Sequence, residues 1–434
     1  MIAGPSFIRA QQPSPSPVAD VTPPSAAVLS PENPSAFDPE RATDAWLDTV
    51  PADKREKSEA YFEGGYWLIL WNFLWSAAVF IFLLQSGISA RLRDFAERLT
   101  KFKALQVIFY TIGFVLLVTV LTLPLNVYQG FFREHQYGLA TQAFGPWFRE
   151  QVIAWGYSLV ALCIALPILY AVFRRAPGTW WIWGAIVATC FVIFGSFISP
   201  LYIEPVFNTY KPLQDPTLRD PILAMARANQ IPVKQVFVFD ASRQTTRISA
   251  NVAGFFGTMR IALNDNLVKQ CTVPEIRAVM AHEMGHYLLN HQVKLVIAQG
   301  ILFLVVFGLT ARFFNSARRR WRIQGIGDPA GLPLLTLILT TLFFALTPVI
   351  NTISRVTERE ADVFGLNTAR EPDGMAKIAL KLGTYRKLSP GPIEEAIFFD
   401  HPSGRSRIRM AMVWKAEQLT GGEVKSDVAS ASSR

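Results

Sequence analysis

The residues best suited to chemistry are His282, Glu283 and His286, which form an H-E-x-x-H sequence. On a helix the two histidines lie one turn apart on the same face, so both imidazoles can reach one ion. Neutral imidazole suits zinc, and a catalytic zinc site combines three protein ligands with a water molecule. Glu283 lies beside this face and can take a proton from that water. With only five histidines in the chain, composition alone rarely produces this spacing, and we expect one catalytic Zn²⁺ per chain.

A helix start signal precedes the motif. Thr272 is a suitable cap, Pro274 fits the first helical turn, and Glu275 lies near the positive end of the helix dipole. Upstream of this signal, the sequence predicts a helix, then a strand rich in β-branched and aromatic residues, then a hairpin or a pair of edge strands. These elements occupy residues 220–229, 235–239, 247–251 and 260–263. The H-E-x-x-H helix therefore belongs to a small α+β domain.

The rest of the chain has the composition of a polytopic membrane protein, since 51% of its residues are hydrophobic and only 17% are charged. Six apolar runs are predicted to span the bilayer, and tryptophans gather near several of their ends, as in an interfacial belt. The runs are 64–90, 104–132, 151–173, 176–203, 295–311 and 329–354. The fifth run is a little short, and we expect its helix to be longer than its uncharged part.

Charge and cysteine content exclude other classes of partner and site. The net charge of +9 comes partly from basic clusters beside the apolar runs. Basic residues at such positions determine the topology of a membrane protein. We therefore expect a lipid bilayer as partner and no nucleic acid. With six spans, the three basic loops after spans one, three and five lie on one side of the membrane. The three cysteines are far apart in sequence and form neither a disulfide framework nor a Cys-x-x-Cys site.

These patterns divide the chain into six parts. We expect a disordered or surface N-terminal tail, four spans, a protease domain with the H-E-x-x-H helix, two further spans, a C-terminal part of the protease domain, and a disordered end. The boundaries are 1–63, 64–203, 204–291, 292–354, 355–417 and 418–434.

A third metal ligand is expected just after the sixth span. The H-E-x-x-H motif lies at the start of the fifth span, and if spans five and six form a helical hairpin, the sixth span ends on the same face of the membrane. Glu358 and Asp362 stand four residues apart there, on one helical face. Glu358 can ligate zinc, and Asp362 can orient a ligating imidazole. Further on, His401 could donate to the oxyanion of a tetrahedral intermediate, with Arg407 near a substrate carboxylate. His291 is off the ligand face and is expected to be structural.

At this point the residues resemble a known family, the type I CAAX prenyl proteases, which are integral-membrane zinc metalloproteases with a glutamate third ligand. The similarity extends from the first span to about Arg409. Its matching segments are His282-Glu283-x-Gly285-His286, Ser354-Arg355 with Glu358 and Ala361-Asp362, and His401-Pro402 with Arg407. The family's Ser-Asn-Ala substrate strand appears here as Ile248-Ser249-Ala250, with Asn251 following.

The resemblance implies zinc on His282, His286 and Glu358, with Glu283 as the base and with Arg355 and Asp362 supporting the ligands. It also implies a mainly α membrane protein, in which tilted spans form a barrel around a water-filled chamber closed by a small α+β protease domain of gluzincin type. Family members cut peptides near a C-terminal prenylated cysteine. A peptide substrate, possibly lipidated, would then add to the edge strand at Ser249, Ala250 and Asn251.

Three functions fit the sequence. The first is a multi-pass membrane zinc endopeptidase of CAAX type, in a bacterial inner membrane or an ER-type membrane. The second is a membrane quality-control protease that needs no prenyl group and uses the same site. The third is a transporter or lipid-binding protein with a structural zinc, which normally has four protein ligands rather than the three visible here. The side of the membrane that the site faces, the natural substrate and the oligomeric state do not follow from the sequence.

Overall fold

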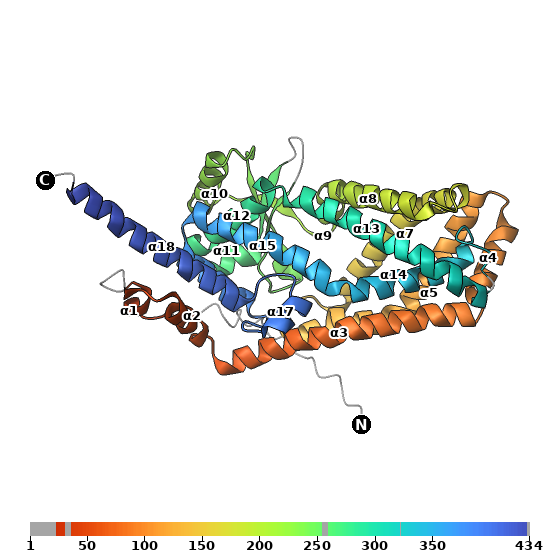
Figure 1. Cartoon of the computed structure of the whole chain (residues 1–434), viewed down its shortest axis with the longest axis horizontal. Coiled ribbons are helices and arrows are strands. Elements are labelled where there is room, and N and C mark those ends of the chain that lie inside the picture. Colours follow the sequence, from red (N-terminus) through yellow and green to blue (C-terminus); the bar gives the residue numbers. More distant parts are fainter. Residues whose placement is uncertain (1–22, 31–35, 254–258, 322, 432–434) are drawn as a thin grey trace, which may run out of the picture.

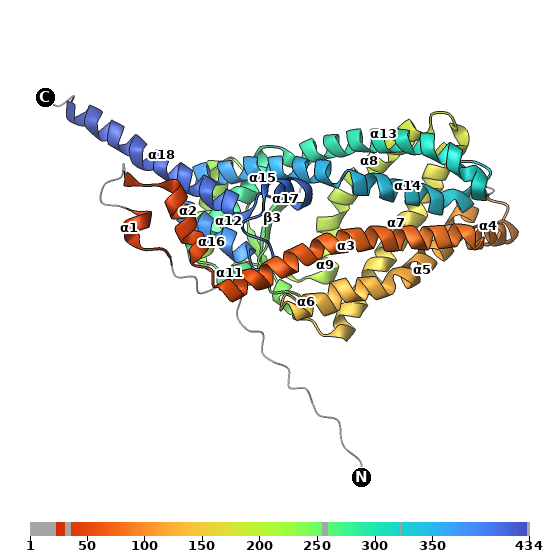
Figure 2. The same cartoon turned by 60° about the horizontal axis from the view of Figure 1, so that its bottom comes forward.

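The computed structural model describes residues 23–30, 36–253, 259–321 and 323–431. Residues 1–22 and 31–35 of the predicted N-terminal tail lie outside these ranges. Long helices run side by side along the long axis of the molecule, and shorter helices with a small sheet gather at one end (Figures 1 and 2). We refer to that end as the protease end.

Five helices in the described ranges are long and apolar enough to cross a membrane, and a bent pair of helices makes a sixth candidate. The five are α3 (Ala52–Gln85), α5 (Lys103–Val127) with its continuation through α6 (Arg133–Gln136), α7 (Phe144–Arg175), α8 (Trp180–Ile198) with its continuation through α9 (Glu204–Phe207), and α13 (His291–Ala317). The pair is α14 (Leu332–Ala345) and α15 (Thr347–Ala369), which meet at an angle of 55°. The predicted number of six spans holds when this bent pair is one span.

Two helix boundaries differ from the sequence-based expectation. Residues 52–63, expected to lie before the first span, form the first turns of α3. α18 (Gly404–Ala431) continues through residues expected to be a disordered end. The expectation for the fifth span is confirmed, because α13 starts at His291 and continues past residue 311.

The basic loops gather at the end of the molecule opposite the protease end. Arg93, on α4 (Ile88–Leu99), forms an ion pair of 3.0 Å with Asp328, which precedes α14. Arg174, at the end of α7, lies against Gly327. The loops after spans one, three and five therefore share one side, as the sequence predicts for six spans.

The sheet at the protease end has four strands in the order β1-β2-β4-β3. They are β1 (Tyr210–Pro212), β2 (Val236–Phe239), β3 (Ala250–Ala253) and β4 (Arg260–Asn264). β2 and β4 are parallel, and β3 pairs antiparallel with β4. The predicted hairpin is confirmed, because β3 and β4 are consecutive strands that pair antiparallel. The alternative of two edge strands is wrong for β4, which is internal, while β3 lies at the edge with its outer side free of a strand partner in the described chain.

One face of the sheet packs on the metal-motif helix α12 (Val273–Leu288). The shared core includes the fully buried Ile261, Leu263, Ile276 and Met280. Burying such side chains contributes on the order of 1.5–3 kcal/mol each. Other helices of this end complete the core: α10 (Pro216–Ala228), α11 (Asp265–Gln270) and α16 (Pro372–Leu382). α17 (Pro392–Phe398) also lies at this end and has no buried residue.

The start of α12 is fixed by a buried carboxylate. Glu275 accepts a hydrogen bond of 2.6 Å from the Thr272 backbone N–H, which confirms the predicted helix start. The same carboxylate pairs at 2.9 Å with Lys381 of α16, and both side chains are at least nine-tenths buried. Removing one partner of such a pair would leave a buried charge uncompensated. The orientation of α12, and hence of its histidines, is therefore tied to α16.

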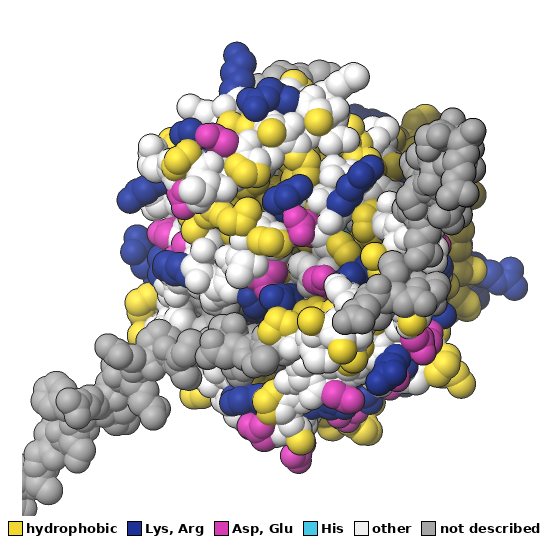
Figure 3. All heavy atoms as spheres, turned by 90° about the vertical axis from the view of Figure 1, so that its left-hand side faces the viewer, with side chains coloured by type: hydrophobic (Ala, Val, Ile, Leu, Met, Phe, Trp, Pro, Cys, Tyr) yellow, Lys and Arg dark blue, Asp and Glu magenta, His cyan; other side chains and the backbone are white. Residues whose placement is uncertain are grey.

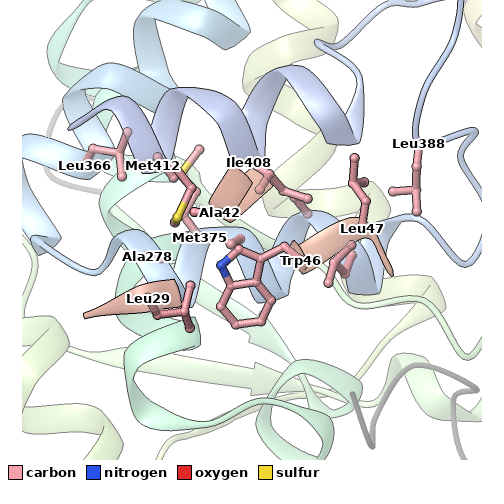
Figure 4. Packing of buried hydrophobic residues seen from close by; sticks show 14 of the residues in the cluster. Leu29, Ala42, Trp46, Leu47, Ala278, Leu366, Met375, Leu388, Ile408 and Met412 are labelled. Atoms are coloured by element: carbon pink, nitrogen blue, oxygen red, sulfur yellow. The ribbon is translucent and has the colours of Figure 1, made fainter. Parts of the chain in front are cut away.

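The segment before the first span docks on the protease end. Short α1 (Ala26–Leu29) and α2 (Pro39–Asp48) pack against α16 and α18, with Trp46 fully buried between them (Figure 4). Asp44 accepts a hydrogen bond of 2.7 Å from Arg405 of α18. Acidic and basic side chains are interspersed over the face of this end (Figure 3), which is typical of a water-exposed surface.

Candidate active site

Helices α12 and α15 bring the three predicted ligands together. The Nε2 atoms of His282 and His286 are 3.1 Å apart, and they lie 3.4 and 3.5 Å from the carboxylate oxygens of Glu358. Two ligand atoms, each about 2.0 Å from a tetrahedral ion, are separated by about 3.3 Å. The two distances to Glu358 end on different oxygens, Oε2 for His282 and Oε1 for His286. With one ligand atom taken from each residue, the three atoms all lie within 4.8 Å of one another, so the three side chains can hold one ion. In the described part of the chain, this is the group of His, Cys, Asp or Glu side chains that meets this distance condition.

Two glycines permit this close crossing of helices. A Cβ atom on Gly365 of α15 would lie 3.1 Å from the backbone nitrogen of His282, and one on Gly285 of α12 would lie 3.2 Å from the Cα of Ala361. Both distances are tighter than ordinary van der Waals contact, and both involve backbone atoms that cannot rotate away. The glycines therefore allow Glu358 to approach the histidines.

His282 is oriented by Asp362, as predicted. Its Nδ1 lies 2.8 Å from the Asp362 carboxylate, which is fully buried, so the Nε2 lone pair is directed at the metal position. Burial alone would lower the pKa of His282, but the hydrogen bond and charge of Asp362 raise it to about 9. Arg407 donates to the same carboxylate through Nε at 2.9 Å and also through Nη2.

This pairing changes the interpretation of Arg407. The sequence suggested a contact with a substrate carboxylate, whereas the structure buries Arg407 to 7% exposure and directs its guanidinium at Asp362. The charge of Arg407 stabilises the Asp362 carboxylate that orients His282. Arg407 still lines the cavity at the metal position.

His286 is oriented by a second set of contacts, which sequence reasoning missed. Its Nδ1 lies 2.9 Å from Nδ1 of His291, whose Nε2 lies 3.0 Å from Glu360, and Lys294 contacts Glu360 at 2.6 Å. When His291 Nε2–H donates to Glu360, the Nδ1 of His291 is an acceptor. His286 then donates its Nδ1–H to that atom, which leaves the Nε2 lone pair of His286 free to bind a metal. We refer to these contacts as the His291–Glu360 relay.

A change of backbone direction makes the relay possible. Asn290 adopts a left-handed conformation, with φ of 54°, between α12 and α13. On one continuous helix, His291 would lie off the ligand face, as the sequence suggested. The break at Asn290 returns the side chain of His291 to His286. Asn290 was the available signal, because asparagine tolerates this conformation better than most residues.

Glu283 faces a cavity of about 220 Å³ beside the ligands. Burial raises the pKa of Glu283 to about 7, and the charge of Glu358 acts in the same direction. A carboxylate with a pKa near neutrality suits proton transfer in both directions. The predicted substrate-strand residues Ser249 and Ala250 line the same cavity.

Asn251 follows on edge strand β3, next to the two cavity-lining residues. Its Oδ1 is buried and has no hydrogen-bond partner in the described chain. Such an acceptor is costly unless something donates to it.

His401 is brought to the metal site from the C-terminal part of the chain. Its Nε2 lies 3.4 Å from Glu358, and its Nδ1 lies 2.8 Å from Asp400. Arg355, expected beside the metal ligands, instead donates to the backbone oxygens of Glu395 and Phe399. Arg355 therefore holds the segment that carries His401, and its contribution to the site is indirect.

A second cavity, of about 910 Å³, lies on the other side of the ligands next to His286. Side chains of β3, α8 and α13 form much of its wall, and most of the lining residues are apolar. They include Val192, Val252, Met259, Leu288, Val293, Leu295 and Val296. The two cavities thus flank the ligands along the edge strand.

Two family models cover most of the chain. The model for peptidase family M48 matches residues 212–415, which contain all three candidate ligands. The model for the CAAX prenyl protease N-terminal region, described as five membrane helices, matches residues 39–209.

Similar curated proteins span most of the same region. The chain is 30% identical over 340 residues to an uncharacterized metalloprotease of Bacillus subtilis, YhfN, covering 77% of this chain and 79% of the relative. It is 28% identical to CAAX prenyl protease 1 of Saccharomyces cerevisiae, covering 67% and 69%, and 28% identical to the homologue from rice, covering 69% and 71%.

The fold is also similar to a solved structure, Ste24p of S. mikatae. The TM-score is 0.71 at 22% identity, and the match covers 84% of this chain and 90% of the other. This likeness confirms the predicted fold class, a barrel of membrane helices with a small α+β protease domain. The chain therefore belongs to peptidase family M48, as a multi-pass integral-membrane metalloprotease of the CAAX prenyl protease 1 group.

Proposed function

We propose that this protein is a zinc-dependent endopeptidase that cuts prenylated peptides near their C-terminus. The observation that carries the proposal is the meeting of His282, His286 and Glu358, whose ligand atoms, one from each residue, all lie within 4.8 Å of one another. Two imidazoles and a carboxylate suit zinc, and a site with three protein ligands leaves a position for water or substrate. A structural zinc, as in the transporter hypothesis, would have a fourth protein ligand.

The roles of the site residues follow from their positions. Zinc, when bound, acidifies water and polarises the scissile carbonyl. Glu283 accepts the proton of that water and passes it to the leaving amine, for which a pKa near 7 is well suited. His401, whose Nδ1 donates to Asp400, lines the cavity, and in its doubly protonated form it can donate to the oxyanion through Nε2, with the Asp400 carboxylate compensating the charge. Asp362 and Arg407 keep His282 in its ligating orientation.

The peptide is expected to bind as an additional strand on β3. Ser249 and Ala250 line the cavity with Glu283, and Val252 lines the cavity on the other side of the ligands. A peptide lying along β3 therefore passes the metal position. Main-chain hydrogen bonds give affinity in this mode of binding, and the buried Oδ1 of Asn251 can accept one more from the substrate.

A prenylated substrate is favoured over the quality-control alternative by two observations. Relatives named CAAX prenyl protease 1 match about two thirds of the chain. The cavity of about 910 Å³ beside His286 is bounded by apolar residues of the membrane helices α8 and α13, and it can accept an isoprenoid chain out of water.

The test is cleavage of a farnesylated C-terminal peptide and its unprenylated counterpart by the purified protein. We expect faster cleavage of the farnesylated peptide, with the activity abolished by Glu283→Gln. Equal cleavage of both peptides, still dependent on Glu283, would instead support a general membrane protease. No cleavage of either peptide by the metal-loaded protein would contradict the proposed endopeptidase activity.

A further inference from the structure

A third cavity, of about 450 Å³, adjoins the cavity at the metal site. The two cavities share Tyr385 and Arg386, which follow α16. Its remaining wall comes from α3, α6, α15, α17 and the segment before β3, and from Asp400, next to His401. A chain that leaves the metal site past Tyr385 therefore enters this third cavity.

The third cavity is lined by three arginines: Arg133, Arg247 and Arg386. The first of these, Arg133 on α6, is only 7% exposed. Its guanidinium lies 4.0 Å from the ring centroid of Tyr61 and donates to the backbone oxygen of Tyr61. No carboxylate of the described residues lies within the 4.0 Å of an ion pair with it. A buried cation without an anionic partner is costly, so this position favours an anion.

The guanidinium groups of the other two arginines also have N–H donors without a protein acceptor among the described residues. Arg247 pairs with Glu134 at 2.7 Å, but its Nε is buried and has no hydrogen-bond partner in the described chain. Arg386 lies near the ring of Tyr385 and makes no ion pair with any described carboxylate. Two carboxylates face this group, namely Glu134, which is bound to Arg247, and Asp400, which is bound to His401. Three cations thus face two carboxylates that already have partners.

The position of Arg247 relates this cavity to one end of the substrate. β3 starts at Ala250, so Arg247 lies just before the strand begins. A peptide that adds antiparallel to β3 has its C-terminus directed toward that end. A strand advances about 3.3 Å per residue, so a few residues after the scissile bond extend about 10 Å from the metal site in the direction of Arg247.

We propose that Arg133, Arg247 and Arg386 form a subsite for the free C-terminal carboxylate of the peptide substrate. Arginine presents a planar fork of donors that matches a carboxylate, and charge-assisted hydrogen bonds of this kind are among the strongest in proteins. This subsite rests on the proposed endopeptidase function. It adds a rule for the cleavage position, because it selects peptide bonds a short distance from the free C-terminus of the substrate.

The experiment compares one farnesylated peptide with a free C-terminal acid and the same peptide as its amide. We expect amidation to lower kcat/KM of the unaltered enzyme by about 10- to 100-fold. In Arg386→Gln the acid and the amide should be cut at similar rates. Arg386 is the first choice for substitution because it is half-buried and makes no ion pair. Arg133→Gln is the second variant, expected to behave in the same way.

The matched control is Arg277→Gln, which removes an arginine paired with Glu371 and outside the lining of these cavities. It should retain the full preference for the acid. If amidation has no effect on the unaltered enzyme, or if its effect is undiminished in both arginine variants, the subsite is wrong while the endopeptidase stands. If the unaltered enzyme cuts neither peptide, the endopeptidase proposal itself fails.

Discussion

Two helices of this protein, α12 and α8, show how differently its two regions are stabilised. On α12, Met280, Ala281 and Met284 are completely buried against protein. On α8, whose most apolar 18-residue window has a mean hydropathy of 2.1, only Trp180, Gly184 and Ala185 near its start are buried, and the other side chains are partly or fully exposed. An apolar helix with so little protein cover needs lipid as its surroundings. The protease end is therefore stabilised mainly by its own packing, whereas the spans, which share one buried cluster near their far ends, depend also on the bilayer.

This difference bears on the metal site. The ligands lie on α12 and α15, which cross so closely that Gly285 and Gly365 are required. Small changes at that crossing move ligand atoms relative to one another, whereas α8 contributes only the wall of a cavity. We therefore expect substitutions at the protease end to have the larger effects, in the following order.

The largest effect is expected for Glu358→Ala. Loss of the carboxylate removes one of three ligands, so bound zinc and turnover should both disappear, with activity falling at least about 1000-fold. Metal content and cleavage rate of the purified variant check this. Glu97→Ala, which removes an exposed carboxylate on α4 at the opposite end of the molecule, is the control and should retain zinc. Full activity of Glu358→Ala would remove Glu358 from the site.

A matched pair of truncations tests the two regions directly. Ile276→Ala on α12, where the side chain is 1% exposed, should lower the free energy of unfolding by about 2–5 kcal/mol. Ile164→Ala on α7, where the side chain is 55% exposed, should cost less, because few protein contacts are lost. Thermal unfolding in the same detergent or nanodisc measures both. Equal destabilisation would contradict the proposed difference between the regions.

The contact of Asp362 with His282 should matter for metal affinity. Asp362→Asn weakens the acceptor that orients the imidazole, and we expect zinc affinity to fall by about 10- to 100-fold. Competition with a chromophoric chelator measures the change. Because Arg407 then loses its carboxylate partner, the fold of the variant is first checked by its unfolding temperature. Unchanged affinity in a folded variant would mean that Asp362 does not orient His282.

A smaller loss is expected at the His291–Glu360 relay. His291→Asn removes the second imidazole, and His286 can then turn, so zinc affinity should fall by about tenfold. The spectrum of the cobalt-substituted protein should change as well, which a merely structural role would not require. His135→Asn, which removes a histidine on α6, is the control. A cobalt spectrum identical to that of the unaltered protein would exclude the relay.

The sequence predicted those parts of the site that depend on local pattern. The start of α12 followed from Thr272 and Glu275, and the spacing of His282 and His286 requires only a helix. Glu358 followed from the expectation that spans five and six return to one membrane face. The apolar runs located the spans because a bilayer of fixed thickness demands long apolar helices.

Other features depend on contacts distant in sequence or on a single backbone angle. The docking of Trp46 requires partners on α16 and α18, hundreds of residues away. The relay depends on the left-handed conformation of Asn290, which bends the chain between two helices. The pairing of Arg407 with Asp362 became evident only when α18 and α15 were seen together. No periodic pattern in the sequence encodes such meetings.

The most direct test of the account is to measure zinc content and turnover together for Glu283→Gln. The substitution keeps the shape of the side chain and removes its ability to accept a proton. We predict one zinc per chain, as in the unaltered protein, with the rate of peptide cleavage lowered by about 100- to 10,000-fold. A variant that holds zinc and still cuts at the native rate would contradict the assignment of Glu283 as the base and, with it, the proposed mechanism.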